Sequence, residues 1–425
     1  MTNDIKLLYC RGPALYDKLS STQCIYCGFD PTADSLHIGN LLAIIGLIHA
    51  HRYGHMAVAL VGGATAQIGD PSGRTKERDR IDLHDVERNV EKLTENLQRI
   101  FDNHSTCFLP RSHNLENIRI VNNISWYQNK NVIDFLSKEG KKFRMNAMLN
   151  KSSVQSRLSK PEGMNFSEFT YQIFQSYDWY QLYKNYKCTI QIGGSDQLGN
   201  ITAGFDFLLK QVDEDSFFGL TIPLITASSG EKLGKSTGNS LWLDPYKTSA
   251  YQLYQYFFNF ADSDVEEYLN LFTFLTDQEI TQILEEHQSA PHKRLAQKRL
   301  GENVTLLVHG EKGLNTAKKW TDVLFGGTVE LLQTLTKDDL QHSPELLVTE
   351  VPVSDKTNLK HLCIDYLKVH PCKYFDKILN TGGLHINYER VNDNITIDDS
   401  HILPNNITMI QLGKKNHYLL KWSDG

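Results

Sequence analysis

The stretch from residue 26 to residue 40 constrains the fold most, because it joins an apolar strand pattern, a polar turn and a helix start. The apolar run at residues 41–48 begins directly after Gly39 and Asn40. His37 to Asn40 would therefore lie at a helix N-terminus, where free backbone N–H groups and the helix dipole favour anions. This arrangement predicts a site for a ligand that carries phosphates.

A second short apolar run, at residues 56–61, completes a strand–helix–strand unit with residues 23–29 and a helix over residues 41–52. The segment 61–73 is too rich in glycine for a core helix, so the chain should turn there against a ligand. The two predicted strands and their turns would thus face one common site.

The sheet is predicted to resume at residues 188–192, after a more polar and largely helical stretch over residues 80–150 that we interpret as an insertion. Short strands that alternate with helices favour the α/β class. The simplest architecture is a Rossmann-like, doubly wound parallel sheet with its ligands at the carboxyl ends of the strands.

Helical periodicity dominates the following region and predicts helices over residues 250–260, 265–272 and 291–309. A helix pattern followed by short strand patterns closes the chain. We therefore predict a Rossmann-like α/β domain with a helical insertion at residues 1–245, an α-helical domain at 246–340, a linker at 341–358 and a small α+β module at 359–425.

The last strand pattern is rich in cations and aromatic rings, which are the side chains that contact a nucleic-acid backbone. Lysines on an edge strand also serve simply to prevent aggregation, so this pattern alone leaves both interpretations open. The residues concerned are Lys414, Lys415, His417, Tyr418, Lys421 and Trp422.

Composition places the chain among ordinary globular proteins. It has 425 residues, of which 40% are hydrophobic and 22% charged, so extended disorder is not expected. The net charge of −6 means that any nucleic-acid surface must be a local basic patch. No apolar stretch approaches the roughly 20 residues that a membrane-spanning helix needs.

The cysteines and the first residues bear on the compartment. Seven scattered cysteines do not form a dense disulfide framework, which favours a reducing environment. Cys24 and Cys27 lack the two further ligands of a metal site and are interpreted as ordinary thiols. Residues 1–25 hold few cations and make a weak targeting peptide, so a cytoplasmic location stays open.

A second motif lies about two hundred residues after the first and contains Lys232, Gly234, Lys235 and Ser236. Two lysines around a glycine can place both ammonium groups on one polyphosphate. The motif is weak alone, because lysine-rich turns are common on protein surfaces. Its value comes from its pairing with the strand–turn–helix segment.

Together the two motifs resemble the HIGH and KMSKS signatures of class I aminoacyl-tRNA synthetases. His37-Ile-Gly-Asn40 is similar to the first signature and Lys232-Leu-Gly-Lys-Ser236 to the second. The resemblance covers essentially the full chain and is to tyrosyl-tRNA synthetases of the bacterial and organellar type. The similar segments are residues 26–39, 59–73, 169–178, 191–202 and the surroundings of Gly382-Gly383.

Several details look most similar to the animal mitochondrial members of that family. They lie at residues 69–78, 125–127, 161–164 and 196–200. The resemblance implies the mitochondrial matrix as the compartment. It also implies that residues 1–245 are the catalytic domain, that the helical domain at 246–340 lies on the anticodon side of the tRNA and that the module at 359–425 binds RNA. A homodimer in which one tRNA contacts both subunits is implied as well.

The resemblance assigns the tyrosine pocket residue by residue. Tyr26 and Asp178 match the pair that reads the phenol, and a site that hydrogen-bonds this hydroxyl rejects phenylalanine, a principle established on tyrosyl-tRNA synthetases themselves. Taken singly, Tyr26 would more often be a packing aromatic and Asp178 a surface acid. The other matching positions are Asp70, Tyr171 and Gln175 for the α-ammonium group, with Gln191 and Gln197 completing the polar network.

Spacing adds an independent argument for part of this set. Tyr171, Gln175 and Asp178 are four and three residues apart, so a helix would project all three from one face. The plain alternative is an amphipathic helix with a solvated polar face. We favour the pocket because Tyr26 and Asp70 belong to the same matched set.

For ATP, the resemblance implies three groups of residues and Mg²⁺ that arrives on the phosphates rather than in a protein cage. Asp196 suits a ribose because a carboxylate accepts two hydroxyl hydrogen bonds. The matching positions are Asp30, Thr32 and His37 in the first segment, Gly194 and Asp196 in the ribose turn, and Lys232, Lys235 and Ser236 in the second motif.

Two positions depart from the family pattern. Asn40 replaces the second histidine of the first signature, yet its amide can present a donor near where an imidazole N–H would lie. Arg74 stands where many bacterial members have lysine and exchanges a point donor for a planar fork. Both stay in the expected catalytic set, with His37, Thr32, Lys232 and Lys235.

The implied activity is that of a tyrosine–tRNA ligase. Tyrosine's carboxylate would attack the α-phosphate of ATP in line, pyrophosphate would leave, and the tyrosyl group would pass to the 3′ end of tRNA(Tyr). A tryptophanyl-type synthetase shares the fold but has no reason to keep Tyr26 with Asp178. The alternative from another class is a synthetase-derived RNA-binding or splicing protein without catalysis.

Overall fold

The computed structural model describes residues 14–74, 76–110, 117–213, 216–222, 235–236, 239–341, 343, 348–369, 372–413 and 416–423. These residues form two compact units. The first comprises residues up to Thr248 together with Phe257–Val308, and the second comprises Ser249–Tyr256 and His309 onward. None of the described helices is long and apolar enough to cross a membrane.

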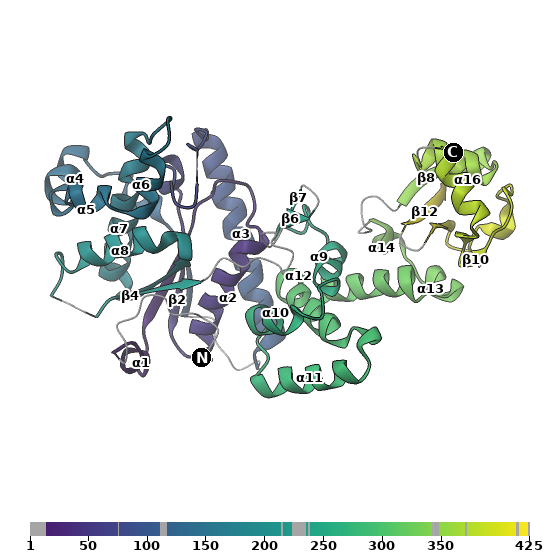
Figure 1. Ribbon diagram of the computed structural model, residues 1–425, viewed down its shortest axis with the longest axis horizontal. Coiled ribbons are helices and arrows are strands. Elements are labelled where there is room, and N and C mark those ends of the chain that lie inside the picture. Colours follow the sequence, from purple (N-terminus) through teal and green to yellow (C-terminus); the bar gives the residue numbers. More distant parts are fainter. Residues whose placement is uncertain are drawn as a thin grey trace. The chain divides into compact units, whose positions relative to one another are not determined.

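A five-stranded parallel sheet is the centre of the first unit (Figure 1). The strand order is β3-β2-β1-β4-β5. The chain thus adds β2 and β3 on one side of β1 and then β4 and β5 on the other, as in a doubly wound sheet. The predicted α/β class is confirmed. The strands are β1 (Cys24–Phe29), β2 (Met56–Val61), β3 (Ile118–Asn122), β4 (Cys188–Gly194) and β5 (Phe218–Ile222).

Helices cover both faces of this sheet (Figure 1). α2 (Ile38–Arg52) contacts β1, β2 and β4, and α3 (Leu83–Phe108) contacts β2 and β3. α7 (Phe166–Tyr186) and α8 (Leu198–Leu208) pack on each other and on β4. The apolar run predicted after Asn40 is therefore a central helix with most of its residues buried.

Residues 80–150 are largely helical, as expected, but the expectation that the sheet resumes only at residue 188 is wrong, because β3 lies within this stretch. β3 pairs with β2 at the edge of the sheet, and its side chains are mostly half-buried, so the sequence there lacks the continuous apolar run of a central strand. The helices that follow are α4 (Val132–Lys138), α5 (Met145–Leu149) and α6 (Ser152–Leu158).

The helical predictions of the middle region hold closely. A helix was expected over residues 250–260, and α9 covers Ala250–Phe258. The helix expected at 265–272 is α10 (Val265–Phe272). α12 (Leu295–Phe325) runs further than the predicted end at residue 309, with non-helical backbone at Gly310. The region also contains α11 (Asp277–Ser289), and α1 (Ala14–Leu19) precedes the sheet.

The second unit contains a five-stranded sheet in the order β10-β9-β11-β12-β8. Residues 341–358 were expected to be a linker, but Val348–Pro352 forms β8, which pairs in parallel with β12. That partner lies some seventy residues further on, so local sequence could not reveal the strand. The other elements are α13 (Val329–Gln333), α14 (Lys337–Gln341), α15 (Leu359–His361), α16 (Cys372–Asn380), β9 (Leu384–Ile386), β10 (Glu389–Arg390), β11 (Ile407–Leu412) and β12 (Asn416–Ser423).

Short elements complete the description. The two-residue strands β6 (Lys235–Ser236) and β7 (Asn239–Ser240) pair with each other. The single turns are η1 (Thr65–Gln67), η3 (Asn123–Trp126), η4 (Gly140–Lys142), η5 (Ser195–Gln197), η6 (Pro291–Lys293), η7 (Val353–Asp355), the π-helical η8 (Leu362–Tyr366) and η9 (Asp399–His401).

Candidate active site

A cavity of about 800 Å³ opens in the first unit, where β1 and β4 end and α2 begins. This is the point where the strand order reverses, and parallel α/β sheets bind ligands in the crevice at that point. The volume is that of a small-molecule site. The cavity thus lies where the strand–turn–helix motif predicted a ligand.

Most of the residues predicted for the two ligands meet in this cavity. Lys232 lies outside the described residues, while Lys235 and Ser236 are described only as backbone in β6. The predicted residues that line the cavity are Tyr26, Asp30, Thr32, His37, Asn40, Asp70, Arg74, Tyr171, Gln175, Asp178, Gln191, Gly194, Asp196 and Gln197.

The start of α2 is held by a reciprocal capping box. The Asn40 Oδ1 atom accepts a hydrogen bond from the His37 backbone N–H at 3.0 Å, and the His37 Nδ1 atom accepts one from the Gly39 N–H at 3.0 Å. Partial desolvation of the ring lowers the pKa of His37, which favours the neutral imidazole needed for this bond. Asn40 therefore has a structural role that its sequence position did not predict.

Asp178 is held in the cavity by three side-chain donors. It lies on α7, and its carboxylate accepts hydrogen bonds from Asn123 Nδ2 at 3.0 Å, Trp126 Nε1 at 2.9 Å and the Tyr127 hydroxyl at 2.8 Å. Burial raises the pKa of Asp178 to about 7, against the lowering effect of these three donors. Such a group is poised between its two protonation states near neutral pH.

Beside Asp178 lie polar atoms that have no hydrogen-bond partner among the described residues. They are the Tyr26 hydroxyl, Gln175 Oε1 and Gln191 Oε1, all fully shielded within the protein. Buried polar groups are nearly always paired, so unpaired ones that line a cavity indicate atoms that a ligand satisfies. Tyr26 and Gln191 lie opposite each other on the neighbouring strands β1 and β4.

A second, half-buried carboxylate lies at the end of β1. Asp30 accepts hydrogen bonds from Thr65 Oγ1 at 2.7 Å and from the Tyr171 hydroxyl at 2.8 Å. Burial raises the pKa of Asp30 to about 6, although both hydroxyls oppose the shift. The structure thus joins Tyr171, assigned to the amino acid, to Asp30, assigned to ATP.

Asn123 links the two carboxylates through one continuous network. Its Nδ2 atom donates to Asp178 and also to Thr65 Oγ1 at 3.0 Å, and Thr65 in turn donates to Asp30. The Asn123 Oδ1 atom accepts from the Ala64 N–H at 2.7 Å, which fixes the orientation of the amide. The two acids therefore hold a fixed separation.

Asp70 anchors the glycine-rich segment that follows β2. Its carboxylate accepts hydrogen bonds from the Ser72 N–H at 2.9 Å, Gln197 Nε2 at 2.7 Å and Asn200 Nδ2 at 3.3 Å. Gln197 also donates to Asp196 at 3.3 Å. These bonds bring the turn after β2 against the turn after β4.

Close approach to the Asp196 side chain explains the glycines at positions 73 and 194. A Cβ atom on Gly194 would lie 2.4 Å from Asp196 Oδ1, and Gly73 takes a φ of +66° directly against the same side chain. The backbone at Gly73 and Gly194 therefore lies close to Asp196 on two sides.

Two further predicted residues lie at the edge of the site. Arg74, next to Gly73, is exposed, and Thr32 donates its backbone N–H to the Asp30 carbonyl at 2.8 Å.

Sequence reasoning missed the residues that support the two carboxylates. Asn123, Trp126 and Tyr127 follow β3, and β3 was not recognised as a strand. The signal was the apolar alternation in Ile118–Asn122 followed by a polar pair, Asn122 and Asn123, at the expected carboxyl end of a strand. Thr65 was missed because a single hydroxyl in a glycine-rich turn gives no pattern.

Gly28 should test the cavity without disturbing the fold. It is exposed within the otherwise buried β1, and a Cβ atom added there would meet nothing within 4 Å. Gly28→Val should therefore leave the unfolding free energy unchanged within about 1 kcal/mol while it takes space that the ligand needs. Urea unfolding and tyrosine-dependent pyrophosphate exchange would measure the two effects.

Gly140→Ala is the matched control, because its Cβ atom would make ordinary contacts with Leu136, away from the cavity. It should change neither stability nor activity. If Gly28→Val kept full activity, the ligand would not pass close to β1.

The fold and this site define a class of protein. A family model described as tRNA synthetases class I (W and Y) matches residues 20–326. The chain belongs to this family.

Similar proteins then separate tyrosine from tryptophan. The mitochondrial tyrosine–tRNA ligase of Drosophila melanogaster is 44% identical over 94% of this chain and 88% of that protein. The one of Homo sapiens is 43% identical over 96% and 87%. A truncated mitochondrial tyrosyl-tRNA synthetase of Aspergillus nidulans has a TM-score of 0.65 at 31% identity, over 73% and 89%.

The function is accordingly that of a tyrosine–tRNA ligase. The enzyme activates tyrosine with ATP to tyrosyl-adenylate, releases pyrophosphate and transfers the tyrosyl group to tRNA. The expected resemblance and the expected ligase activity are both confirmed. Tyrosine, ATP and tRNA are its substrates.

Proposed function

We propose that the phenol of tyrosine binds between Asp178 and Tyr26. The observation that carries this proposal is the incomplete coordination of Asp178. A carboxylate has about four acceptor positions, and three protein donors occupy three of them. The fourth is available to the substrate hydroxyl, and the unpaired Tyr26 hydroxyl contacts the same oxygen.

The opposite end of tyrosine, its α-ammonium group, is proposed to lie among Asp30, Asp70 and Tyr171, with Gln175 Oε1 as a further acceptor. The buried Asp70 and the half-buried Asp30 offer the negative charge that this cation needs, and both line the same cavity as Asp178. Gln191 and Gln197 would complete the polar wall. We therefore infer that Asp30 contacts the amino acid rather than ATP alone.

ATP is proposed to lie with its phosphates at the start of α2, near Thr32, His37 and Asn40. The positive end of the dipole of that helix favours phosphate oxygens, and Asp196 beside Gly194 would hold the ribose. Arg74 and the second motif, with Lys232, Lys235 and Ser236, are proposed to neutralise charge as pyrophosphate leaves. No protein nucleophile is required.

Mg²⁺ is proposed to reach the site on the phosphates of ATP. Among the described residues, no group of three or more histidine, cysteine or acidic side chains could hold a metal ion. The Asp30 and Asp70 carboxylates are already engaged by protein donors. These residues do not fit a dedicated metal cage.

Pyrophosphate exchange tests the assignment of the amino-acid site. Exchange should depend on tyrosine and be undetectable with phenylalanine or tryptophan at equal concentration. Phenylalanine is the sharper control, because it lacks only the hydroxyl that Asp178 would bind. Equal exchange with phenylalanine would refute the proposed role of Asp178 and Tyr26.

The pH dependence follows from the raised pKa of Asp178, which is about 7. Above pH 7 the carboxylate is ionised and accepts the phenol, whereas below pH 7 a proton occupies the fourth acceptor position. We expect kcat/KM for tyrosine to be roughly tenfold lower at pH 6 than at pH 8. A flat profile over this range in the exchange assay would contradict the assignment.

We further propose that the module from residue 359 onward contacts tRNA(Tyr) and that the enzyme acts as a homodimer in the mitochondrial matrix. The compartment rests on the named mitochondrial relatives. The dimer is supported by apolar side chains that are strongly exposed near α4–α6, with Val132, Ile133, Met145 and Phe166 between 59% and 77% exposed. Sedimentation of a fully active monomer would refute the dimer.

A further inference from the structure

Tyr388 adopts a backbone conformation that an aromatic residue rarely takes. It has a φ of +69° and follows Asn387 at +47° in the two-residue turn between β9 and β10. Such a turn normally has glycine at the second position. A bulky residue retained in the left-handed region therefore calls for a compensating contact elsewhere.

That contact is with the last turn of α12. The Tyr388 hydroxyl donates a hydrogen bond to the Val323 carbonyl oxygen. The chain makes room for the ring, because a Cβ atom on Gly327 would lie 2.0 Å from the hydroxyl. Tyr388 thus fits a notch that only glycine at position 327 leaves open.

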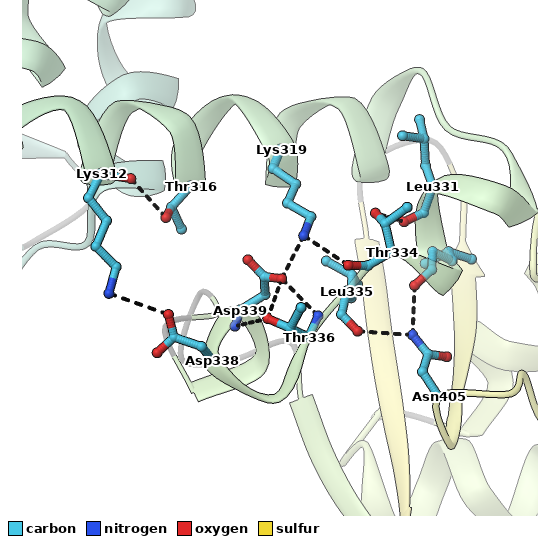
Figure 2. A network of polar contacts seen from close by, with 11 residues as sticks. Lys312, Thr316, Lys319, Leu331, Thr334, Leu335, Thr336, Asp338, Asp339 and Asn405 are labelled. Atoms are coloured by element: carbon cyan, nitrogen blue, oxygen red, sulfur yellow. Dashed lines mark hydrogen bonds and ion pairs between the residues drawn. The ribbon is translucent and has the colours of Figure 1, made fainter.

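A second anchor lies on the turn before β11. Asn405 Nδ2 donates to the carbonyl oxygens of Leu332 at 2.9 Å and Leu335 at 3.2 Å (Figure 2). These carbonyls belong to the end of α13 and the residues directly after it, where helical hydrogen bonding stops. Asn405 therefore ties the sheet of the module to a helix end outside it.

An apolar core joins the same parts. Trp320, Leu324 and Leu332 from the helices pack with Ile407 and Leu419 from the strands, and all five are buried. Burial of this kind resembles the inside of one domain and not a contact between two tethered ones. The module and the end of α12 are one packed body.

The segment that leads from α12 toward the module is also held by hydrogen bonds up to α14. Lys319 Nζ donates to Asp339 at 2.6 Å and to the Thr334 carbonyl at 2.9 Å, and Thr336 caps α14 through Asp339 (Figure 2). Despite its partial burial, these bonds lower the pKa of Asp339. The connection holds α13 and α14 against α12.

We propose that Tyr388 and Asn405 are positioning residues for tRNA charging. They dock the C-terminal module on the end of α12, so that tRNA bound by the module is held in one place. This rests on the proposed function of the module as a tRNA contact. The docking explains why a strained tyrosine and a glycine notch occur together.

The test uses full-length protein with Tyr388→Phe, Asn405→Ala and Gly327→Ala. The first two remove a hydrogen bond, and the third fills the notch. KM for tRNA should rise on the order of threefold to tenfold, the range expected from one lost hydrogen bond. Tyrosine-dependent pyrophosphate exchange should not change, and hydrogen–deuterium exchange should increase at residues 329–336 and 403–409.

Two further variants separate docking from general stability. Tyr366→Phe removes a hydroxyl that bonds to Asp355, just before the module, and it should leave KM for tRNA unchanged. Tyr388→Gly relieves the left-handed strain but removes the packing of the ring, so the melting temperature should change little while KM for tRNA still rises. A purely structural role for Tyr388 would not produce that combination.

Cross-linking of tRNA to the unmodified protein separates two claims: that the module contacts tRNA, and that Tyr388 and Asn405 position the module. Without cross-links at residues 348–423, the proposed tRNA contact of the module fails. With cross-links there but with KM unchanged in Tyr388→Phe and Gly327→Ala, the contact stands and the positioning role is overturned. Unchanged deuterium exchange in all three variants would also overturn it.

Discussion

Replacing Asp178 by asparagine should reduce kcat/KM for tyrosine in pyrophosphate exchange by about 10²–10³-fold, corresponding to about 3–4 kcal/mol. Asparagine has the shape of aspartate, but one of its terminal groups is a donor. Both carboxylate oxygens of Asp178 accept hydrogen bonds from protein donors. In either orientation of the asparagine amide, its NH₂ group would therefore face one of these donors. The variant would lose the acceptor for the phenol and disturb the network around it.

Discrimination between tyrosine and phenylalanine shows whether Asp178 reads the phenol hydroxyl. If Asp178 reads the hydroxyl, the variant should lose activity with tyrosine and lose most of its discrimination against phenylalanine. Asn123→Ala is an informative companion, because it removes one donor and leaves the carboxylate in place. Wild-type discrimination in Asp178→Asn would show that another group recognises the phenol.

Arg157→Ala should destabilise the first unit by about 3–5 kcal/mol, because it leaves a buried charge without its partner. The Arg157 guanidinium donates to both Glu168 oxygens, at 3.1 and 2.8 Å, and the two side chains are only 2% exposed. It also donates to the carbonyl oxygens of Lys76 and Gly163. The pair thus connects α6, the start of α7 and the segment after Asp70.

Urea unfolding of the full chain measures this effect, and a double variant provides its control. Arg157→Met combined with Glu168→Leu removes both charges and keeps apolar volume, so it should recover much of the lost stability. Arg88→Ala breaks an exposed pair with Asp85 and should cost less than about 1 kcal/mol. A loss that small for Arg157→Ala would show that water reaches Glu168.

Sequence reasoning succeeded where a pattern is local. The spacing of Tyr171, Gln175 and Asp178 predicted one helix face, and the structure brings all three to the cavity. The strand–turn–helix segment before Asn40 likewise located the ligand end of the sheet. The roles of these residues toward tyrosine and ATP remain predictions.

Features that depend on distant partners could not be predicted. β8 is stabilised by pairing with β12, which is distant in the sequence. The role of Asn123 likewise depends on its hydrogen bonds to Asp178 and Thr65. Tyr388 shows the same limit, since nothing near it in the sequence indicates a positive φ or a neighbour such as Val323. Long-range pairing and buried networks are decided by the folded structure and not by local preference.

The capping box at the start of α2 also changes how the departure from the first signature is understood. Because the Asn40 oxygen is engaged by the His37 N–H, the backbone there is already in its helical form before any nucleotide arrives. The free-energy cost of ordering that turn is met during folding. ATP binding is therefore not weakened by that cost. Asparagine at this position therefore preorganises the end of the site where we propose that the phosphates bind.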